Sequence, residues 1–298
     1  MAEHGLELLT WTWPRRSSDY CLVVERPRGA CLAGWYGVAD MIGRPVRRYG
    51  WRGYVRAIER RLRRRLRTAD PATEAEHQAL LRDELVRHDA YLHDIRSRHD
   101  DSAFGFCVCF AAVYGHACRV YNLGDARAWR LRRQATPGRR TPAFAAHALT
   151  RDHNGVDQRL RETGSPTAFF GSELLDLSRK LTCFLGIGEA EAVHAAIDES
   201  GETFTLEPNE CLLLATDGFF MPMIREALGL SEGLTLQSFY LEDWLAQLLA
   251  READNLKTTR PSWSDLVGGL VAEARAGAAR HPAYRDDIAL LALYRAGD

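Results

Sequence analysis

Four aspartates stand beside predicted strands at widely separated places along the chain. They are Asp40 after residues 35–39, Asp125 after 120–123, Asp217 after 211–215 and Asp286 before 288–293. An ionised carboxylate at the edge of a core is unfavourable unless it is paired, hydrogen-bonded or bound to a metal. If these strand ends converge, the carboxylates repel one another, and a hard cation such as Mg²⁺ or Mn²⁺ relieves that repulsion better than Zn²⁺. The alternative is that each aspartate is a separate turn or cap residue.

The elements that would position these acids follow two hydrophobic periods. Apolar residues three and four apart predict helices at 55–66, 81–95, 238–253 and 264–279, with a break at Asp70-Pro71. Shorter apolar runs predict strands, and Trp11 and Trp13 alternate as in an edge strand. These runs are 20–25, 31–39, a hairpin of 104–113 and 117–123 that 128–131 extends, a second hairpin of 203–206 and 210–215, and 288–294. Antiparallel strands interleaved with helices predict an α+β sandwich in one domain spanning residues 1–298.

Composition excludes some functions and favours one compartment. The 298 residues carry a net charge of −1, which creates no overall field for nucleic acid or a membrane surface. No secretory signal or membrane span is recognisable. The seven cysteines are an odd number without a C-x-x-C pair, which favours buried reduced thiols over a disulfide framework or a zinc site. We therefore expect a cytoplasmic protein.

Five motifs in order resemble the metal-dependent, type 2C Ser/Thr protein phosphatase family. They are GVADMIG (37–43), YNLGDARAW (121–129), LTRDHN (149–154), LLATDGFF (213–220) and RDDIALL (285–291). The resemblance extends from about Arg15 to Tyr294. It implies a sandwich of two antiparallel β-sheets flanked by α-helices on both sides, a four-layer αββα arrangement. It also implies hydrolysis of phosphoserine and phosphothreonine in proteins, opposing a Ser/Thr kinase.

The resemblance assigns roles to individual residues. Asp40 matches the metal-bridging aspartate, Asp217 and Asp286 match the other two ligands of the metal pair, and Asp19 matches an acid of the N-terminal motif. Asp125 matches an acid linked to a third, weaker metal site. The implied cofactors are two Mg²⁺ or Mn²⁺ ions. Two such ions, roughly 3.5–4 Å apart, activate a shared water and neutralise charge on the phosphate.

Several positions depart from the family pattern. Met41 replaces a glycine whose carbonyl contributes to the metal shell, and a residue with a Cβ would strain a turn that needs glycine dihedrals. Ser18 replaces a glutamate, and Met221 replaces an acid, so we expect the third metal site to be weak or absent. Pro14 replaces the phosphate-clamping arginine, which leaves Arg15, with Arg16 as the alternative, to bind phosphate.

These departures keep other functions open. One alternative is a catalytically impaired pseudophosphatase that binds phosphoproteins as a regulatory module. Another keeps the metals but hydrolyses a small phosphoester. The arginine-rich segment 56–67 predicts a solvated helix face with pairing inside the protein, with partner docking as its alternative. We expect His153 to order its loop, and we expect a monomer that binds a phosphorylated protein substrate but neither nucleic acid nor membrane.

Overall fold

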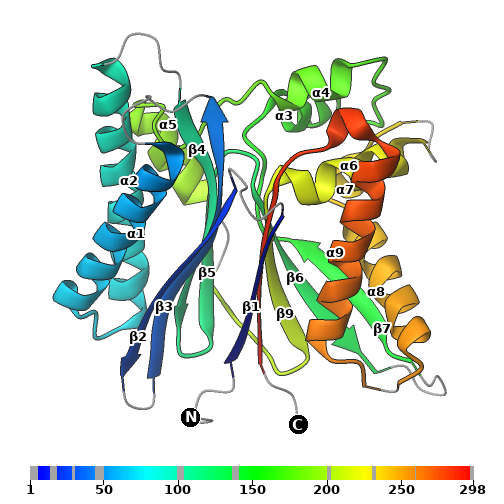
Figure 1. Cartoon of the computed structure of the whole chain (residues 1–298), viewed down its shortest axis with the longest axis horizontal. Coiled ribbons are helices and arrows are strands. Elements are labelled where there is room, and N and C mark those ends of the chain that lie inside the picture. Colours follow the sequence, from blue (N-terminus) through cyan, green and yellow to red (C-terminus); the bar gives the residue numbers. More distant parts are fainter. Residues whose placement is uncertain are drawn as a thin grey trace.

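Two five-stranded antiparallel sheets lie face to face between two groups of helices (Figure 1). The computed structural model describes residues 6–13, 19–28, 31–43, 50–98, 104–135, 141–199, 203–229, 233–258 and 260–295. The first sheet has the order β1 (Leu6–Trp13), β10 (Ile288–Arg295), β9 (Glu210–Ala215), β6 (Arg127–Gln134) and β7 (Ala143–Ala148). The second has the order β2 (Tyr20–Arg28), β3 (Cys31–Gly43), β4 (Phe104–Tyr114), β5 (Ala117–Leu123) and β8 (Phe204–Thr205). The predicted α+β sandwich is therefore confirmed.

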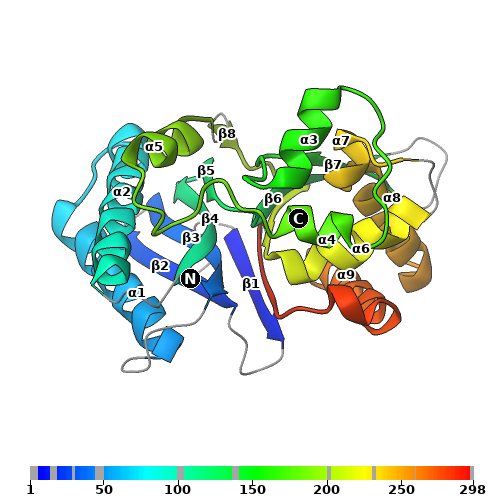
Figure 2. The same ribbon diagram turned by 90° about the horizontal axis from the view of Figure 1, so that it is seen from above.

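Helices cover the outer face of each sheet, as the view from above shows (Figure 2). The second sheet carries α1 (Gly50–Ala69), α2 (Glu74–Ser97) and α5 (Ala190–Glu199). The first sheet carries α6 (Asp217–Gly229), α7 (Leu236–Phe239), α8 (Glu242–Leu256) and α9 (Trp263–Arg280). The short helices α3 (Gly155–Thr163) and α4 (Glu173–Ser178) and the 3₁₀ turn Pro282–Tyr284 complete the described fold.

Strand alternation divides the core into three apolar layers. Along β3, Tyr36 and Val38 pack between the two sheets, whereas Trp35 and Ala39 face the helices α1 and α2. The third layer lies between the first sheet and helices α6–α9. Because successive side chains of a strand point to opposite faces, the next even-numbered residue, Asp40, continues the row between the sheets.

The predicted break between the first two helices is confirmed. Asp70 adopts a left-handed backbone with φ of 50°, which ends α1 at Ala69. Thr73 then caps α2, because its side chain accepts from Glu76 N while the Glu76 side chain accepts from Thr73 N. A single turn therefore folds α2 back beside α1.

Two of the predicted strand pairings are wrong. β8 pairs with β5 in the second sheet, whereas β9 pairs with β10 and β6 in the first, so these neighbours in sequence form no hairpin. Residues 128–131 likewise belong to β6 in the first sheet and do not extend the hairpin of β4 and β5. Gly124, with φ of 105°, turns the chain from one sheet to the other, and the Glu210 carboxylate ties β9 to Arg130 and Arg132 of β6.

The first described strand lies at a sheet edge. β1, which contains Trp11 and Trp13, forms the edge of the first sheet, as predicted. Cys21, Cys107, Cys109, Cys118, Cys183 and Cys211 are free thiols. No helix in the described parts of the chain combines the length and apolar character needed to cross a membrane.

Candidate metal centre

The four predicted acids line one cavity at the end of the sandwich. Asp40, Asp125, Asp217 and Asp286 share a hollow of about 240 Å³. They come from the last residues of β3, the turn after β5, the first residue of α6 and the segment before β10. The interpretation of these aspartates as isolated turn residues is therefore wrong, because the sandwich brings all four together.

Strand β3 continues past its predicted end and fixes the direction of Asp40. The strand runs on to Gly43, with Asp40 opposite Cys107 and Met41 opposite Phe106 of β4. Asp40 and Ile42 line the cavity, whereas the Met41 side chain packs towards the core beneath α1 and α2. Met41 is absent from the described residues with a left-handed backbone, and Gly43 takes that conformation with φ of 76°. The strain considered for Met41 is therefore not present.

Asp19 does not line the cavity but is hydrogen-bonded to Asp40, which does. It is only 2% exposed, shares a hydrogen bond with Asp40, and accepts one at Oδ2 from the Thr216 hydroxyl. Thr216 Oγ1 in turn accepts from Ala289 N at 2.9 Å, which ties the start of α6 to β10. Arg15, its alternative Arg16, and Ser18 lie outside the described residues.

Burial and mutual repulsion raise the pKa values of these acids and so favour their protonated forms. Burial, then the charges of Asp19 and Asp217, raise the pKa of Asp40 well above its ordinary value. Burial, then Asp125 and Asp286, do the same to the pKa of Asp217. Burial also raises the pKa of Asp19 to about 7, although Asp40 and Thr216 oppose the rise. Positive charge in the cavity would restore the ionised state of this cluster.

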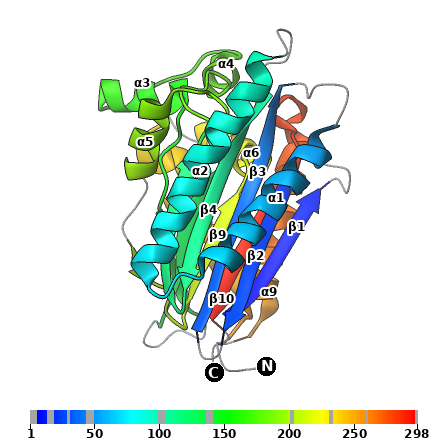
Figure 3. The same cartoon turned by 90° about the vertical axis from the view of Figure 1, so that its left-hand side faces the viewer.

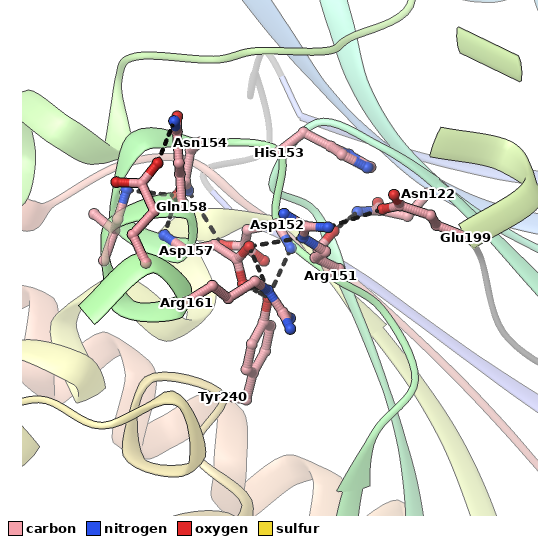
Figure 4. Close-up of polar contacts among 12 residues, drawn as sticks. Asn122, Arg151, Asp152, His153, Asn154, Asp157, Gln158, Arg161, Glu199 and Tyr240 are labelled. Carbon is pink, nitrogen blue, oxygen red and sulfur yellow. Dashed lines mark hydrogen bonds and ion pairs between the residues drawn. The ribbon is translucent and has the colours of Figure 1, made fainter. Parts of the chain in front are cut away.

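The LTRDHN segment holds the turn that carries Asp125. His153 N donates to Gly124 O at 2.9 Å, and the His153 ring Nδ1 lies 3.2 Å from Gly124 N. Asn122 Nδ2 donates to both Gly124 O and Arg151 O. Figure 4 shows Asn122, Arg151 and His153 in this arrangement. His153 does not line the cavity, and its contacts agree with the predicted role in ordering the loop.

A buried ion pair anchors the same segment to the helices beyond it. Arg127, which is fully buried, donates to both carboxylate oxygens of Asp152 at 2.8 Å and to Phe239 O. The Tyr240 hydroxyl donates to Asp157 Oδ1 at 2.6 Å and accepts from Asp152 N at 2.8 Å. Figure 4 shows Tyr240 reaching between the two carboxylates, with Arg161 directed at Asp157. The loop beside Asp125 is thus held from both sides.

Sequence reasoning missed the cations and the hydroxyl around the cavity. Arg179, the residue after α4, and Arg285, just before Asp286, line the same cavity as the acids. Arg285 also stacks over Trp13 at 5.3 Å, and the positive charge of Arg179 opposes the rise in the pKa of Asp286. No periodicity marks an exposed arginine as a site residue. Thr216 could have been identified from the sequence. It stands between a buried strand and Asp217, and a buried hydroxyl there needs a hydrogen-bond partner.

The donor chemistry fits a hard divalent cation, but the ligand set is not preformed. The cavity offers several carboxylates, and Asp217 Oδ1 is buried without a hydrogen-bond partner among the described residues. Oxygen donors of this kind suit Mg²⁺ or Mn²⁺. Within the described ranges, however, no three His, Cys, Asp or Glu side chains converge closely enough to hold a metal ion. The acids share a cavity and would need to approach one another more closely to become ligands of one ion.

Solved structures identify the fold. A serine/threonine phosphatase of S. agalactiae matches with a TM-score of 0.63 and 16% identity over 97% of this chain and 99% of its own. Stp1, a serine/threonine phosphatase of Staphylococcus aureus, matches with a TM-score of 0.59 and 14% identity over 97% and 94%. The catalytic domain of the serine/threonine phosphatase PstP, solved with two manganese ions, matches with a TM-score of 0.55 and 13% identity over 97% of both chains.

These matches establish the architecture. The chain has the type 2C phosphatase fold over nearly its full length, as its ordered motifs indicated. No family model and no curated protein matches the sequence itself.

Proposed function

We propose that this protein is a Mg²⁺- or Mn²⁺-dependent phosphatase of phosphoserine and phosphothreonine in proteins. One observation carries the proposal: four aspartates from distant parts of the chain line a single cavity of about 240 Å³. Their burial and repulsion raise their pKa values, which a pair of divalent cations would reverse. The fold shared with serine/threonine phosphatases supports the same reaction.

Each acid has a position suited to its proposed role. Asp40, Asp217 and Asp286 would hold the ions, with the carbonyl of Met41, next to Asp40 in β3, as a further proposed ligand. Bound ions would supply an activated water and neutralise the phosphate charge. Asp19 is hydrogen-bonded to Asp40 and itself accepts a hydrogen bond from the Thr216 hydroxyl. Beside Asp125 the cavity wall includes the apolar side chain of Met221, so a third ion would have few ligands there.

Two arginines give the substrate phosphate a place to bind. Arg179 and Arg285 lie in the cavity wall with the acids. A guanidinium donates two parallel hydrogen bonds to phosphate oxygens, and Arg179 is an exposed residue of the cavity wall. We therefore add Arg179 to Arg15 as a phosphate-binding residue. A phosphoprotein substrate implies that the enzyme opposes a Ser/Thr kinase.

A second candidate function is a pseudophosphatase that binds phosphoproteins without turning them over. It is favoured by the lack of a convergent metal-ligand cluster in the described ranges and by Met221 in the cavity wall. On this alternative, the arginines bind phosphate while the acids stay too far apart to hold metal.

Turnover of a phosphothreonine peptide separates the two functions. The wild-type protein should release phosphate in Mn²⁺ and stop when EDTA is added. Asp217→Asn should lose at least a hundredfold in kcat, whereas Asp94→Asn, at an exposed residue of α2, should retain the wild-type rate. Tight peptide binding with no phosphate release by the wild type in Mg²⁺ or Mn²⁺ would establish the pseudophosphatase instead.

A further inference from the structure

The charge of this chain is concentrated in one segment. Residues 44–67 contain eleven arginines and one acid, Glu59, and so carry a net charge of +10 in a chain whose total is −1. Most of these residues belong to α1, which lies across the outer face of the second sheet beside α2 (Figure 3). The rest of the chain is correspondingly acidic.

Pairing inside the protein accounts for only some of these arginines. Arg63 meets Glu59 at 2.9 Å, and Arg65 meets Glu84 at 3.1 Å. Arg61 lies over the Tyr91 ring at 4.8 Å. For these three side chains, the predicted solvated face with internal pairing is confirmed.

Four other arginines have no such partner. Arg56, Arg60, Arg64 and Arg67 are exposed, and none forms an ion pair with a carboxylate in the part of the chain that the structure describes. Their spacing of four, four and three residues places them in one row along the helix, which we call the arginine stripe. Like charges at this spacing destabilise a helix by mutual repulsion. Repulsion between side chains that no neighbouring acid relieves is typical of functional surfaces.

The dimensions of the arginine stripe match an extended peptide. Four helical residues advance about 6 Å, and the whole stripe spans about 16 Å. Alternate residues of an extended chain are about 6.6 Å apart and point to the same side. Acidic side chains at every second position of a five-residue segment would therefore each face an arginine.

The acidic charge of the rest of the chain makes a nucleic acid or a membrane a poor partner for the arginine stripe. A nucleic-acid duplex or a membrane surface would extend beyond one helix and meet the acidic remainder of the chain. A short acidic segment of a protein touches the stripe alone. We propose that the arginine stripe is a docking site for an acidic, extended segment of a partner protein. The site lies on α1, apart from the cavity residues, and does not depend on the phosphatase proposal.

Fluorescence anisotropy with a labelled ten-residue peptide of alternating Glu and Ser tests this proposal. The wild-type protein should bind the peptide at 50 mM salt and lose most of that binding at 500 mM. The variant R56Q/R60Q/R64Q/R67Q should bind at least tenfold more weakly, since each exposed pair contributes a factor of about 1.4–5. The matched control R82Q/R98Q/R251Q/R280Q removes the same charge from surface ion pairs elsewhere and should bind like the wild type.

Three results would overturn the proposal. One is no binding by the wild type at 50 mM salt, and another is equal weakening in both quadruple variants. The third is stripe-dependent binding of a single-stranded oligonucleotide or of vesicles with anionic lipid that is tighter than peptide binding at 150 mM salt. Circular dichroism spectra of both variants should match that of the wild type, which checks that the helices are intact.

Discussion

The Thr216 hydroxyl donates a hydrogen bond to Oδ2 of Asp19, although the two residues are 197 positions apart in the chain. The same hydroxyl oxygen accepts from Ala289 N, so one buried side chain joins an acid beneath the cavity to a central strand. Asp19 in turn hydrogen-bonds Asp40. The arrangement makes Thr216 a positioning residue for the acidic cluster.

Replacing Thr216 by valine should therefore loosen this cluster. Valine has nearly the same shape but leaves Asp19 Oδ2 without its buried donor, which costs about 1–3 kcal/mol of unfolding free energy. Urea unfolding of Thr216→Val measures that loss. Thr216→Ser keeps the hydroxyl and serves as the control. Equal stability of Thr216→Val and the wild type would contradict the assignment.

The buried pair of Arg127 and Asp152 gives a second prediction. Arg127→Met leaves a carboxylate buried without its cation, and a loss of about 3–5 kcal/mol is expected. The double variant Arg127→Met/Asp152→Asn should be destabilised by less than the sum of the two single changes, because each single change strands the other partner. Additive losses in a double-mutant cycle by urea unfolding would show that the pair is not coupled.

Arg179 should affect substrate binding more than stability. Removing its guanidinium in Arg179→Ala should raise KM for a phosphothreonine peptide roughly tenfold, since a hydrogen bond to a charged group is lost. Lys180→Ala is the matched control, because Lys180 is exposed beside it but does not line the cavity. An unchanged KM in Arg179→Ala, or an equal rise in both variants, would remove Arg179 from the site.

Buried His77 makes the stability of the fold sensitive to acid. Its ring packs 5.7 Å from Trp35 and 5.8 Å from Tyr114, and burial lowers its pKa to about 4. In the unfolded chain the pKa is about 6.5, so between these values the unfolded state binds more protons and stability falls as pH falls. The contribution of His77 to the loss between pH 7 and pH 5 is about 2 kcal/mol.

Urea unfolding at the two pH values measures this effect. His77→Phe should reduce the difference between pH 7 and pH 5 by about 2 kcal/mol. His194→Phe, at an exposed histidine of α5, should leave it unchanged. The same pH dependence in wild type and His77→Phe would exclude His77 as its source.

Hydrophobic spacing predicted the positions of helices and strands better than it predicted which strands pair. Periodicity located α1, α2, α9, β4, β5 and β10, because each has a continuous apolar face. It assigned wrong partners to β6, β8 and β9. Short connections usually join strands of one sheet, whereas here the connections β5–β6 and β8–β9 pass from one sheet to the other. A positive φ at Gly124 and the ion pairs of Glu210 decide that crossing, and neither is visible in hydrophobic spacing.

The acids of the site were predictable, whereas their surroundings were not. Asp40, Asp125, Asp217 and Asp286 stand at strand ends, where the local pattern conflicts with burial of a charge. Arg179 lies after a six-residue helix with no such conflict. Met41 would strain the site only if the turn needed glycine dihedrals at that position, but the strand continues through Met41 and the left-handed conformation occurs at Gly43.

The most direct measurement of the central claim is Mn²⁺ binding by isothermal titration calorimetry. If the carboxylates in the cavity hold a metal pair, the wild-type protein should bind two Mn²⁺ ions per chain, and Asp217→Asn should lose at least one of them. Asp94→Asn should bind as the wild type does. A wild-type protein that binds no Mn²⁺ at millimolar concentration, or an Asp217→Asn variant that binds it equally well, would contradict the account.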